Sequence, residues 1–174
     1  PEDAYYAGED MRAFLVETEA ATQVDFRPYY HWRGKAAQGR YVNVDSSGNR
    51  KTVKYPRRDA QRVFCMGGST MWGRGVPDKF TIPSLLQERL GNGYDVHNLG
   101  EQGFVAVQEL NLLLERLAQG DVPDIVVFYD GVNDGYAGVY SPGEPRQPQK
   151  VGADFARLAA GQRQGFWATV FEAL

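Results

Sequence analysis

The sequence predicts a doubly wound α/β domain, because three strand-like runs alternate with two segments whose apolar residues recur at helical spacing. The strand-like runs cover residues 63–66, 94–98 and 124–129, and the first and last are apolar in the manner of buried strands. The helical segments cover residues 82–90 and 110–117. Since such crossovers are right-handed, we expect parallel strands whose following loops emerge on one edge of the sheet.

The composition fits one globular domain. The chain has 174 residues, of which 43% are hydrophobic, enough for one sizeable core and too few for two ordinary domains. The net charge of -3 and the scattered Lys and Arg argue against a nucleic-acid partner. Cys65 is the one cysteine, so an intrachain disulfide is excluded, and we expect it in the core. No metal or organic cofactor is expected, because no His, Cys or carboxylate cluster has ligand spacing.

No apolar run approaches the length of a membrane span. The chain begins with Pro1 in place of a methionine, so we expect the start of the gene product to be missing. A signal peptide or membrane anchor in that region would make the protein exported or membrane-tethered. The sequence leaves the compartment and the oligomeric state open.

The first part of the chain is expected to form a helix, an aromatic extended segment and a β-hairpin. Residues 24–34 are rich in aromatic side chains and are interrupted by Pro28, which favours an extended segment over a helix. Residues 41–44 and 51–54 have strand-like patterns on either side of a turn sequence, which predicts the hairpin. The apolar positions of the first helix are Ala4, Ala7, Met11, Phe14 and Leu15.

The two crossover helices have recognisable ends. Thr81 is expected to cap the first at its start and Gly91 to end it, whereas the second stops near Gly120. The strand at 124–129 that follows is the clearest buried strand in the sequence. The expected apolar faces are Ile82, Leu85, Leu86 and Leu90 in the first helix, and Leu110, Leu113, Leu114 and Leu117 in the second.

Each of the two histidines has two interpretations. His31 lies in the aromatic segment and is either a distant base for Ser69 or one member of a packing patch, which we favour because nothing fixes its distance. His97 lies in the second strand, where its ring should point into a helix–sheet interface. We therefore expect a core histidine there rather than a base.

Three residues follow the three predicted strands, namely Ser69, Gly103 and Asn133. Equivalent strand ends bring them to one rim, where ligands bind in open α/β sheets. Taken alone, Ser69 is better explained as a capping serine after a glycine turn. Acyl transfer requires a nucleophilic oxygen and fixed donors about 3 Å from the developing oxyanion. The backbone N–H groups of Ser69 and Gly103 and the side-chain amide of Asn133 are three such donors.

The segments around these residues resemble the sequence blocks of a known enzyme family. Gly67-Gly-Ser-Thr70 resembles the first block of the SGNH (GDSL-like) hydrolases, although many members carry Asp where this chain has Gly68. Residues 98–104, Asn-Leu-Gly-Glu-Gln-Gly-Phe, resemble the second block, and residues 131–134, Gly-Val-Asn-Asp, match the third. The three blocks occur in the family's order at three successive strand ends.

The resemblance implies a flavodoxin-like, three-layer α/β/α fold with a parallel sheet, and a serine esterase or acyl hydrolase. It assigns Ser69 as nucleophile and first oxyanion donor, with Gly103 and Asn133 as the other two donors. The substrate would be a small-molecule or glycan ester. On this basis residues 1–58 form an N-terminal extension, and residues 59–174 form the N-terminal part of the hydrolase core.

The family's last block, Asp-x-x-His, is absent from this sequence. Residues 141–149 are expected to form a proline-rich loop, residues 154–160 a short helix, and residues 166–174 an apolar helical stripe with little left to cover it. The third strand would also leave an open, apolar sheet edge. We therefore expect an incomplete hydrolase whose base lies beyond Leu174, although the stripe could instead pack back on the sheet.

A different class of function stays open, in which the chain is an inactive module that binds a glycan or an acylated ligand.

Three residues close to the blocks also have two interpretations each. Asp134 either orders its loop by accepting backbone hydrogen bonds, which is favoured, or touches substrate. Trp72 and Arg74 either line the pocket or are rim residues without a specific task.

Overall fold

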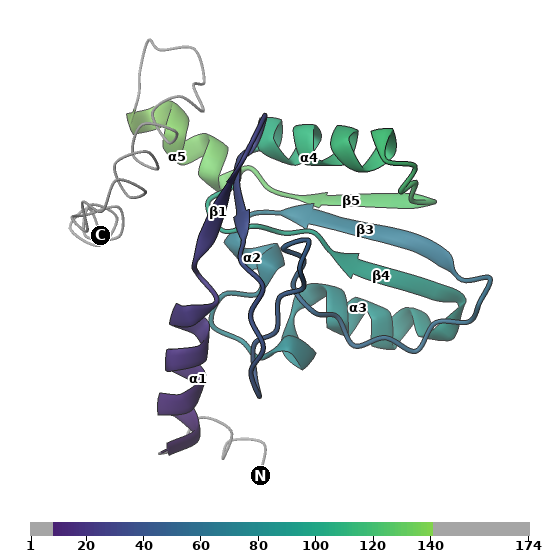
Figure 1. Cartoon of the computed structure of the whole chain (residues 1–174). Coiled ribbons are helices and arrows are strands. Elements are labelled where there is room, and N and C mark those ends of the chain that lie inside the picture. Colours follow the sequence, from purple (N-terminus) through teal and green to yellow (C-terminus); the bar gives the residue numbers. More distant parts are fainter. Residues whose placement is uncertain (1–8, 141–174) are drawn as a thin grey trace. The chain divides into compact units, whose positions relative to one another are not determined.

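The computed structural model describes the backbone of residues 9–140 and the side chains of residues 11–136 (Figure 1). Contacts divide the chain into two units, Pro1–Gly135 and Tyr136–Leu174, and the elements up to β5 belong to the first. The loop expected at 141–149, the helix at 154–160 and the stripe at 166–174 lie outside the described residues. The boundary expected between residues 58 and 59 stays a prediction.

A parallel sheet of three strands forms the centre of the first unit. β3 (Gln61–Gly67) lies between β4 (Tyr94–Asn98) and β5 (Ile125–Tyr129), as Figure 1 shows. Val63 of β3 pairs with a residue in each neighbouring strand. The three predicted strands and their parallel order are confirmed. β3 is buried on both faces, which explains its continuous apolar run.

Helices connect the strands. After β3 come α2 (Ser69–Trp72), the 3₁₀ turn η2 (Asp78–Phe80), α3 (Ile82–Leu90) and the 3₁₀ turn η3 (Gly91–Gly93). α4 (Ala106–Ala118) connects β4 to β5, and α5 (Val132–Tyr140) follows β5. The chain moves from β3 to one neighbour and then crosses to the other, so α3 and α4 lie on opposite sides of the sheet (Figure 1). This is an α/β fold, as expected.

α3 begins and ends as predicted but buries a different face. The Thr81 hydroxyl accepts a hydrogen bond from the N–H of Ser84 at 3.3 Å, and the helix ends at Gly91. The buried side chains are Pro83, Ser84 and Gln87, whereas the predicted apolar positions Ile82, Leu85 and Leu90 are exposed. Gln87 explains the difference, because its amide binds the backbone of the neighbouring strand, accepting from Val96 N at 2.8 Å and donating to Tyr94 O at 2.9 Å.

α4 and β5 are also less buried than their sequences predict. The buried residues of α4 are Gln108, Glu109 and Leu112. β5 is an edge strand of the described sheet rather than a buried one, which agrees with the expected open edge. The exposed apolar side chains of these two elements are Val107, Leu110, Leu114, Leu117, Ile125, Phe128 and Tyr129.

The N-terminal segment forms α1 (Glu9–Ala20) and an antiparallel pair of strands, β1 (Val24–Arg27) and β2 (His31–Gly34). The extended conformation predicted for residues 24–34 is thus confirmed, and it closes on itself as a hairpin. In α1, Phe14 is buried against Tyr41, their ring centroids 6.0 Å apart, whereas Leu15 is exposed.

The hairpin predicted from residues 41–44 and 51–54 forms in part: the chain turns back, Lys51 N donates to Asn43 O at 2.9 Å and Val44 bridges Arg50, but no regular strands occur. Carboxylates bind other backbone N–H groups of this stretch. One oxygen of Glu17 accepts the N–H groups of Tyr41 and Val42 at 2.7 and 3.1 Å, and Asp78 accepts that of Asn43 at 3.1 Å. Tyr41, Val42 and Val44 are all buried, so the alternation indicated a half-exposed strand that does not form.

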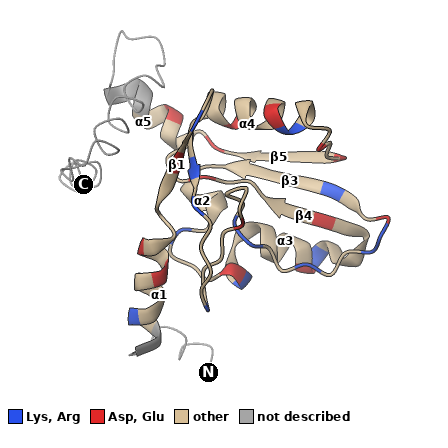
Figure 2. Ribbon diagram, viewed as in Figure 1, with Lys and Arg blue, Asp and Glu red and all other residues tan. Residues whose placement is uncertain are grey.

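The remaining expectations concern the single cysteine, the distribution of charge, membrane-spanning helices and metal sites. Cys65 is fully buried, as expected, and burial raises the pKa of its thiol to about 12. Figure 2 shows acidic and basic residues interspersed along the described elements. Within residues 9–140 no helix is long and apolar enough to cross a membrane. In the same residues, no group of three or more His, Cys, Asp or Glu side chains has the arrangement of a metal site.

Candidate active site

The loops that follow β3, β4 and β5 meet at the carboxyl edge of the sheet. The side-chain nitrogen of Asn133 donates a hydrogen bond to the carbonyl oxygen of Phe104 at 2.7 Å. A β-carbon on Gly68 would lie 2.6 Å from that nitrogen and 3.5 Å from that oxygen. The three predicted segments are therefore in mutual contact. They meet where the strand order reverses, which is the place where open α/β sheets bind ligands.

Ser69 is the first residue of α2 and is half-buried. Gly68 before it is extended, and its carbonyl accepts the N–H of Trp72 at 3.0 Å. The N–H of Ser69 has no partner within the helix, because the first N–H groups of a helix lack a preceding turn. The backbone thus holds this N–H in place at the rim without engaging it in the helix.

Gly103 has a left-handed backbone, with φ of +77°. A side chain at this position would be strained, since L-residues rarely adopt that conformation. Asn133 uses one amide hydrogen on Phe104, and a carboxamide nitrogen carries two. The second hydrogen is available to a ligand at the same rim.

The β1–β2 hairpin holds the loop that contains Gly103. The indole nitrogen of Trp32 donates to the carbonyl oxygen of Gln102 at 3.0 Å. The ring of Trp32 would lie 3.5 Å from a β-carbon on Gly103, and it packs edge-on against Phe104 at 5.7 Å. The glycine is therefore bounded on one side by the hairpin.

Arg33 continues this contact one residue further along β2. Its guanidinium donates to the carbonyl oxygens of Leu99 and Gly100 at 3.0 and 3.1 Å. It also pairs with the carboxylate of Glu101 at 3.4 Å, with both side chains buried. That carboxylate accepts the N–H groups of Gly34 and Gln102 at 2.7 and 2.9 Å.

The sequence did not reveal the contacts that Arg33 and Glu101 make with each other and with the loop at residues 99–102. Arg33 and Glu101 belong to segments whose pairing only the folded chain establishes. The one available signal was a pair of opposite charges placed in stretches that are otherwise aromatic or glycine-rich. Arg33 and Glu101 together hold residues 99–102 in place, and thereby the backbone that leads into Gly103.

Trp72 and Arg74 separate in the structure. Trp72 is fully buried beneath the guanidinium of Arg50, which lies 4.4 Å from its ring centroid, so it is a core residue and neither of its two interpretations holds. Arg74 is exposed and donates to the side-chain oxygen of Gln102 at 3.0 Å. It therefore contacts the same loop as the hairpin, from the side of α2.

Asp134 accepts the N–H of Ala106 at 3.1 Å, so it binds backbone as expected, although that of α4 rather than of its own loop. Close by, Glu109 is buried in the first turns of α4. Burial, and then the negative charge of Asp130, raise the pKa of Glu109 to about 8. This carboxyl is thus held protonated at neutral pH beside the loop that contains Asn133.

His97 does not point into a helix–sheet interface, and that expectation is wrong. Its ring is partly exposed and shares hydrogen bonds with Asp95 at 2.8 Å and Lys54 at 3.1 Å. Burial, and then the charge of Lys54, lower the pKa of its imidazole. His97 is therefore occupied by the two charged groups beside it.

His31 has a left-handed backbone with φ of +71°, and its ring lies 6.3 Å from that of Trp32. Burial lowers the pKa of its imidazole. These contacts agree with the aromatic packing interpretation.

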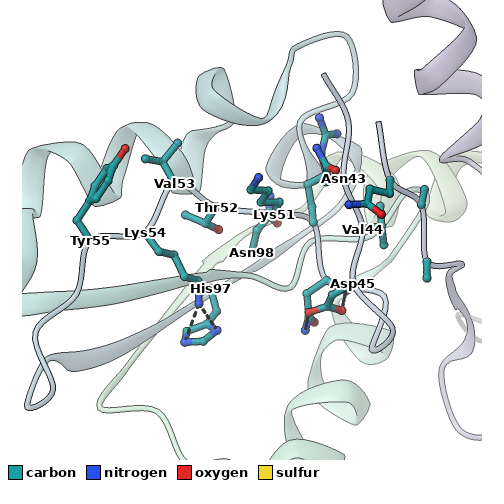
Figure 3. Close-up of a pocket in the computed structure, with 15 residues that line it drawn as sticks. Asn43, Val44, Asp45, Lys51, Thr52, Val53, Lys54, Tyr55, His97 and Asn98 are labelled. Atoms are coloured by element: carbon teal, nitrogen blue, oxygen red, sulfur yellow. Dashed lines mark hydrogen bonds between the residues drawn. The ribbon is translucent and has the colours of Figure 1, made fainter. Parts of the chain in front are cut away.

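A groove of about 880 Å³ lies beside the outer edge of β4 (Figure 3). Its walls include Lys54, His97, Thr52 and Asn98. Figure 3 shows Lys54 pointing at the His97 ring from the segment that runs beside the strand. None of Ser69, Gly103 and Asn133 lines this groove, so it is distinct from the rim described above.

Comparison with known proteins gives a partial similarity to an esterase. No family model matches the sequence. An acetylxylan esterase of Xylanibacter ruminicola is 34% identical over 91 residues, which are 48% of this chain and 19% of that esterase. The chain therefore spans about a fifth of the length of the relative it matches. The similarity relates this stretch of the chain to part of an esterase.

Proposed function

We propose that the chain is part of a serine esterase of the SGNH type with a flavodoxin-like fold. The observation that carries the proposal is the contact among the three loops, in which Asn133, Phe104 and Gly68 lie against one another at the carboxyl edge. This contact is what an oxyanion site built from Ser69, Gly103 and Asn133 requires. The partial similarity to an acetylxylan esterase supports the same class of reaction.

In the proposed mechanism the hydroxyl of Ser69 attacks the carbonyl carbon of an ester. A general base accepts the hydroxyl proton as the new C–O bond forms. The oxyanion accepts hydrogen bonds from the N–H groups of Ser69 and Gly103 and from the Asn133 amide, each donor contributing about 2.7–4 kcal/mol to the transition state. The base then protonates the leaving alcohol, and water hydrolyses the acyl-serine in a second, equivalent step.

The base is proposed to be a histidine beyond Leu174, as the family resemblance implies. His97 is engaged by Asp95 and Lys54, and His31 packs beside Trp32. The proposed substrate is an acyl ester of a small molecule or a glycan. The name of the relative, an acetylxylan esterase, favours an acetyl ester of a polysaccharide.

The test is hydrolysis of 4-nitrophenyl acetate by the full-length protein, together with labelling by a serine-directed phosphonate. Ser69→Ala should abolish both, whereas Ser46→Ala, which changes an exposed serine, should leave both intact. Unchanged hydrolysis in Ser69→Ala would refute the nucleophile assignment.

The second candidate is an inactive module that keeps the rim and binds an acylated ligand or a glycan. The observation in its favour is that each histidine of this sequence has a packing or hydrogen-bonding partner of its own. Ligand affinity without turnover, and no phosphonate label in the full-length protein, would establish this module in place of the esterase.

A further inference from the structure

We propose that the β1–β2 hairpin is a carbohydrate-binding platform, in which the rings of Phe26 and Tyr29 stack on sugar rings beside the acylated one. The inference rests on the proposed function, since it assigns a glycan to the alcohol side of the ester. It names a site and residues outside the three sequence blocks.

The first observation is the place of the hairpin. Figure 1 shows β1 and β2 at the end of the sheet toward which the strands β3, β4 and β5 point. Trp32 and Arg33 of β2 bind Leu99, Gly100 and Gln102 directly. The hairpin is therefore a wall of the rim rather than a distant appendage.

The second observation is the register of the two strands. Phe26 pairs directly with Trp32, and residues that face each other across an antiparallel pair share one face. Trp32 uses that face to contact Gly103 and Phe104. Phe26 therefore lies one strand outward on the same face, and the residue is 64% exposed. An apolar ring is left open to solvent beside the proposed oxyanion site.

The third observation is strain at the tip of the hairpin. Tyr29 has φ of +70°, a conformation that is a genuine outlier for a bulky residue, and its side chain is 82% exposed. α4 holds the tip in place, because Asn111 donates to the Tyr29 carbonyl at 2.9 Å and Gln108 to the Tyr30 carbonyl at 2.9 Å. The Tyr30 N–H also donates to the Pro28 carbonyl at 2.9 Å, so a tight turn fixes the backbone of the tip, from which Tyr29 is exposed to solvent.

Carbohydrate is the ligand class that these features favour. A flat, exposed ring on a rigid backbone offers contact area with little loss of side-chain entropy, and the C–H face of a pyranose is its natural complement. Phe26 adjoins the wall of the proposed acyl site, and Tyr29 lies farther along the hairpin, where α4 holds the tip, so an extended glycan ester would contact both rings. A short aryl ester would reach only the oxyanion site.

The experiment measures binding of xylohexaose without acetyl groups to the full-length protein by titration calorimetry. The double variant Phe26→Ala, Tyr29→Ala should weaken binding about tenfold. Phe26→Trp should retain it. Tyr55→Ala is the matched control, because Tyr55 is also exposed, at 72%, but lies outside the hairpin. The Tyr55→Ala variant should bind xylohexaose with the affinity of the unaltered protein.

Tyr29→Gly separates binding from folding. Glycine adopts a positive φ without strain, so this variant should raise the melting temperature while it weakens xylohexaose binding. A lower melting temperature with unchanged affinity would show that the ring serves the fold, and would overturn the proposal. So would equal affinity of the double variant and the unaltered protein, or no binding by the unaltered protein.

The two proposals fail in different ways. If Ser69→Ala abolishes 4-nitrophenyl acetate hydrolysis but the hairpin variants bind xylohexaose normally, the esterase stands and the platform is wrong. If the hairpin variants lose xylohexaose while Ser69→Ala hydrolyses the ester normally, the platform stands and the nucleophile is wrong.

Discussion

Arg33 and Glu101 lie 68 residues apart in the sequence and form an ion pair of 3.4 Å in which each side chain is only 1% exposed. The pair joins the N-terminal hairpin to the loop that follows β4. The pair also binds backbone on both sides, at Gly34, Leu99 and Gly100, and the guanidinium donates to the side-chain oxygen of Asn49 at 3.0 Å. The position of Gly103 therefore depends on a segment that precedes the sheet in the chain.

We expect Arg33→Met to destabilise the protein by about 3–5 kcal/mol, because it leaves the buried carboxylate of Glu101 without its counter-charge. Lys35→Met is the matched control, since Lys35 pairs with Asp25 at 3.3 Å on the surface, with both side chains about half exposed. That change should cost less than about 1 kcal/mol. Urea unfolding measures both. Equal losses in the two variants would show that the buried pair contributes nothing beyond a surface pair.

Gly68→Ala should disturb the rim with little effect on the fold. The new methyl group would lie 2.6 Å from the Asn133 amide and must move that amide away from Phe104. The expected result is a loss of ester hydrolysis of about a hundredfold, the typical effect of removing one oxyanion donor. Gly93→Ala is the control, because its nearest contact would be Arg57 at 3.9 Å. Identical rates in both variants would contradict the role assigned to Asn133.

Glu109→Gln should change how stability depends on pH. The pKa of Glu109 in the folded state is about 8, above its ordinary value of 4.5, so the folded protein holds an extra proton between these values. Stability should therefore fall as pH rises from about 4.5 to 8. An amide at this position would remove that slope and leave the variant more stable at pH 9, by about 1–2 kcal/mol after allowance for solvent screening.

Urea unfolding of the Glu109 variant at pH 5, 7 and 9 measures this difference. Glu88→Gln, which neutralises an exposed glutamate of α3, controls for the loss of one charge. Parallel pH profiles for Glu109→Gln and the unaltered protein would show that this carboxyl does not retain its proton in the fold.

Asp134→Ala should destabilise the start of α4. Asp134 accepts the N–H of Ala106, and the N-cap residue of that helix is Val105, whose side chain has no acceptor of its own. A lost cap costs about 1 kcal/mol. Asp59→Ala is the control, since Asp59 is exposed and pairs with the exposed Arg57 at 3.6 Å. Thermal unfolding compares them, and equal melting temperatures would contradict the capping role.

The sequence by itself determined the three strands of the parallel sheet, the ends of α3 and the order of the three rim residues. These features follow from local sequence. A continuous apolar run such as that of β3 indicates a buried strand, and Thr81 caps α3 by accepting the N–H of a residue three positions away. Because parallel strands end at one edge, the meeting of the segments around Ser69, Gly103 and Asn133 also followed from the order of the elements.

Only the tertiary structure decided which polar groups are buried. Gln87 of α3 and Glu101 of the second loop are buried, Glu17 of α1 is half-buried, and each binds backbone N–H groups of another segment. Such a carboxylate or amide stabilises the fold only when its partners are in place, since burying it alone would cost free energy. No local pattern can indicate those partners, which is why the buried face of α3 was predicted wrongly and the regular strands of the hairpin at residues 41–54 do not form.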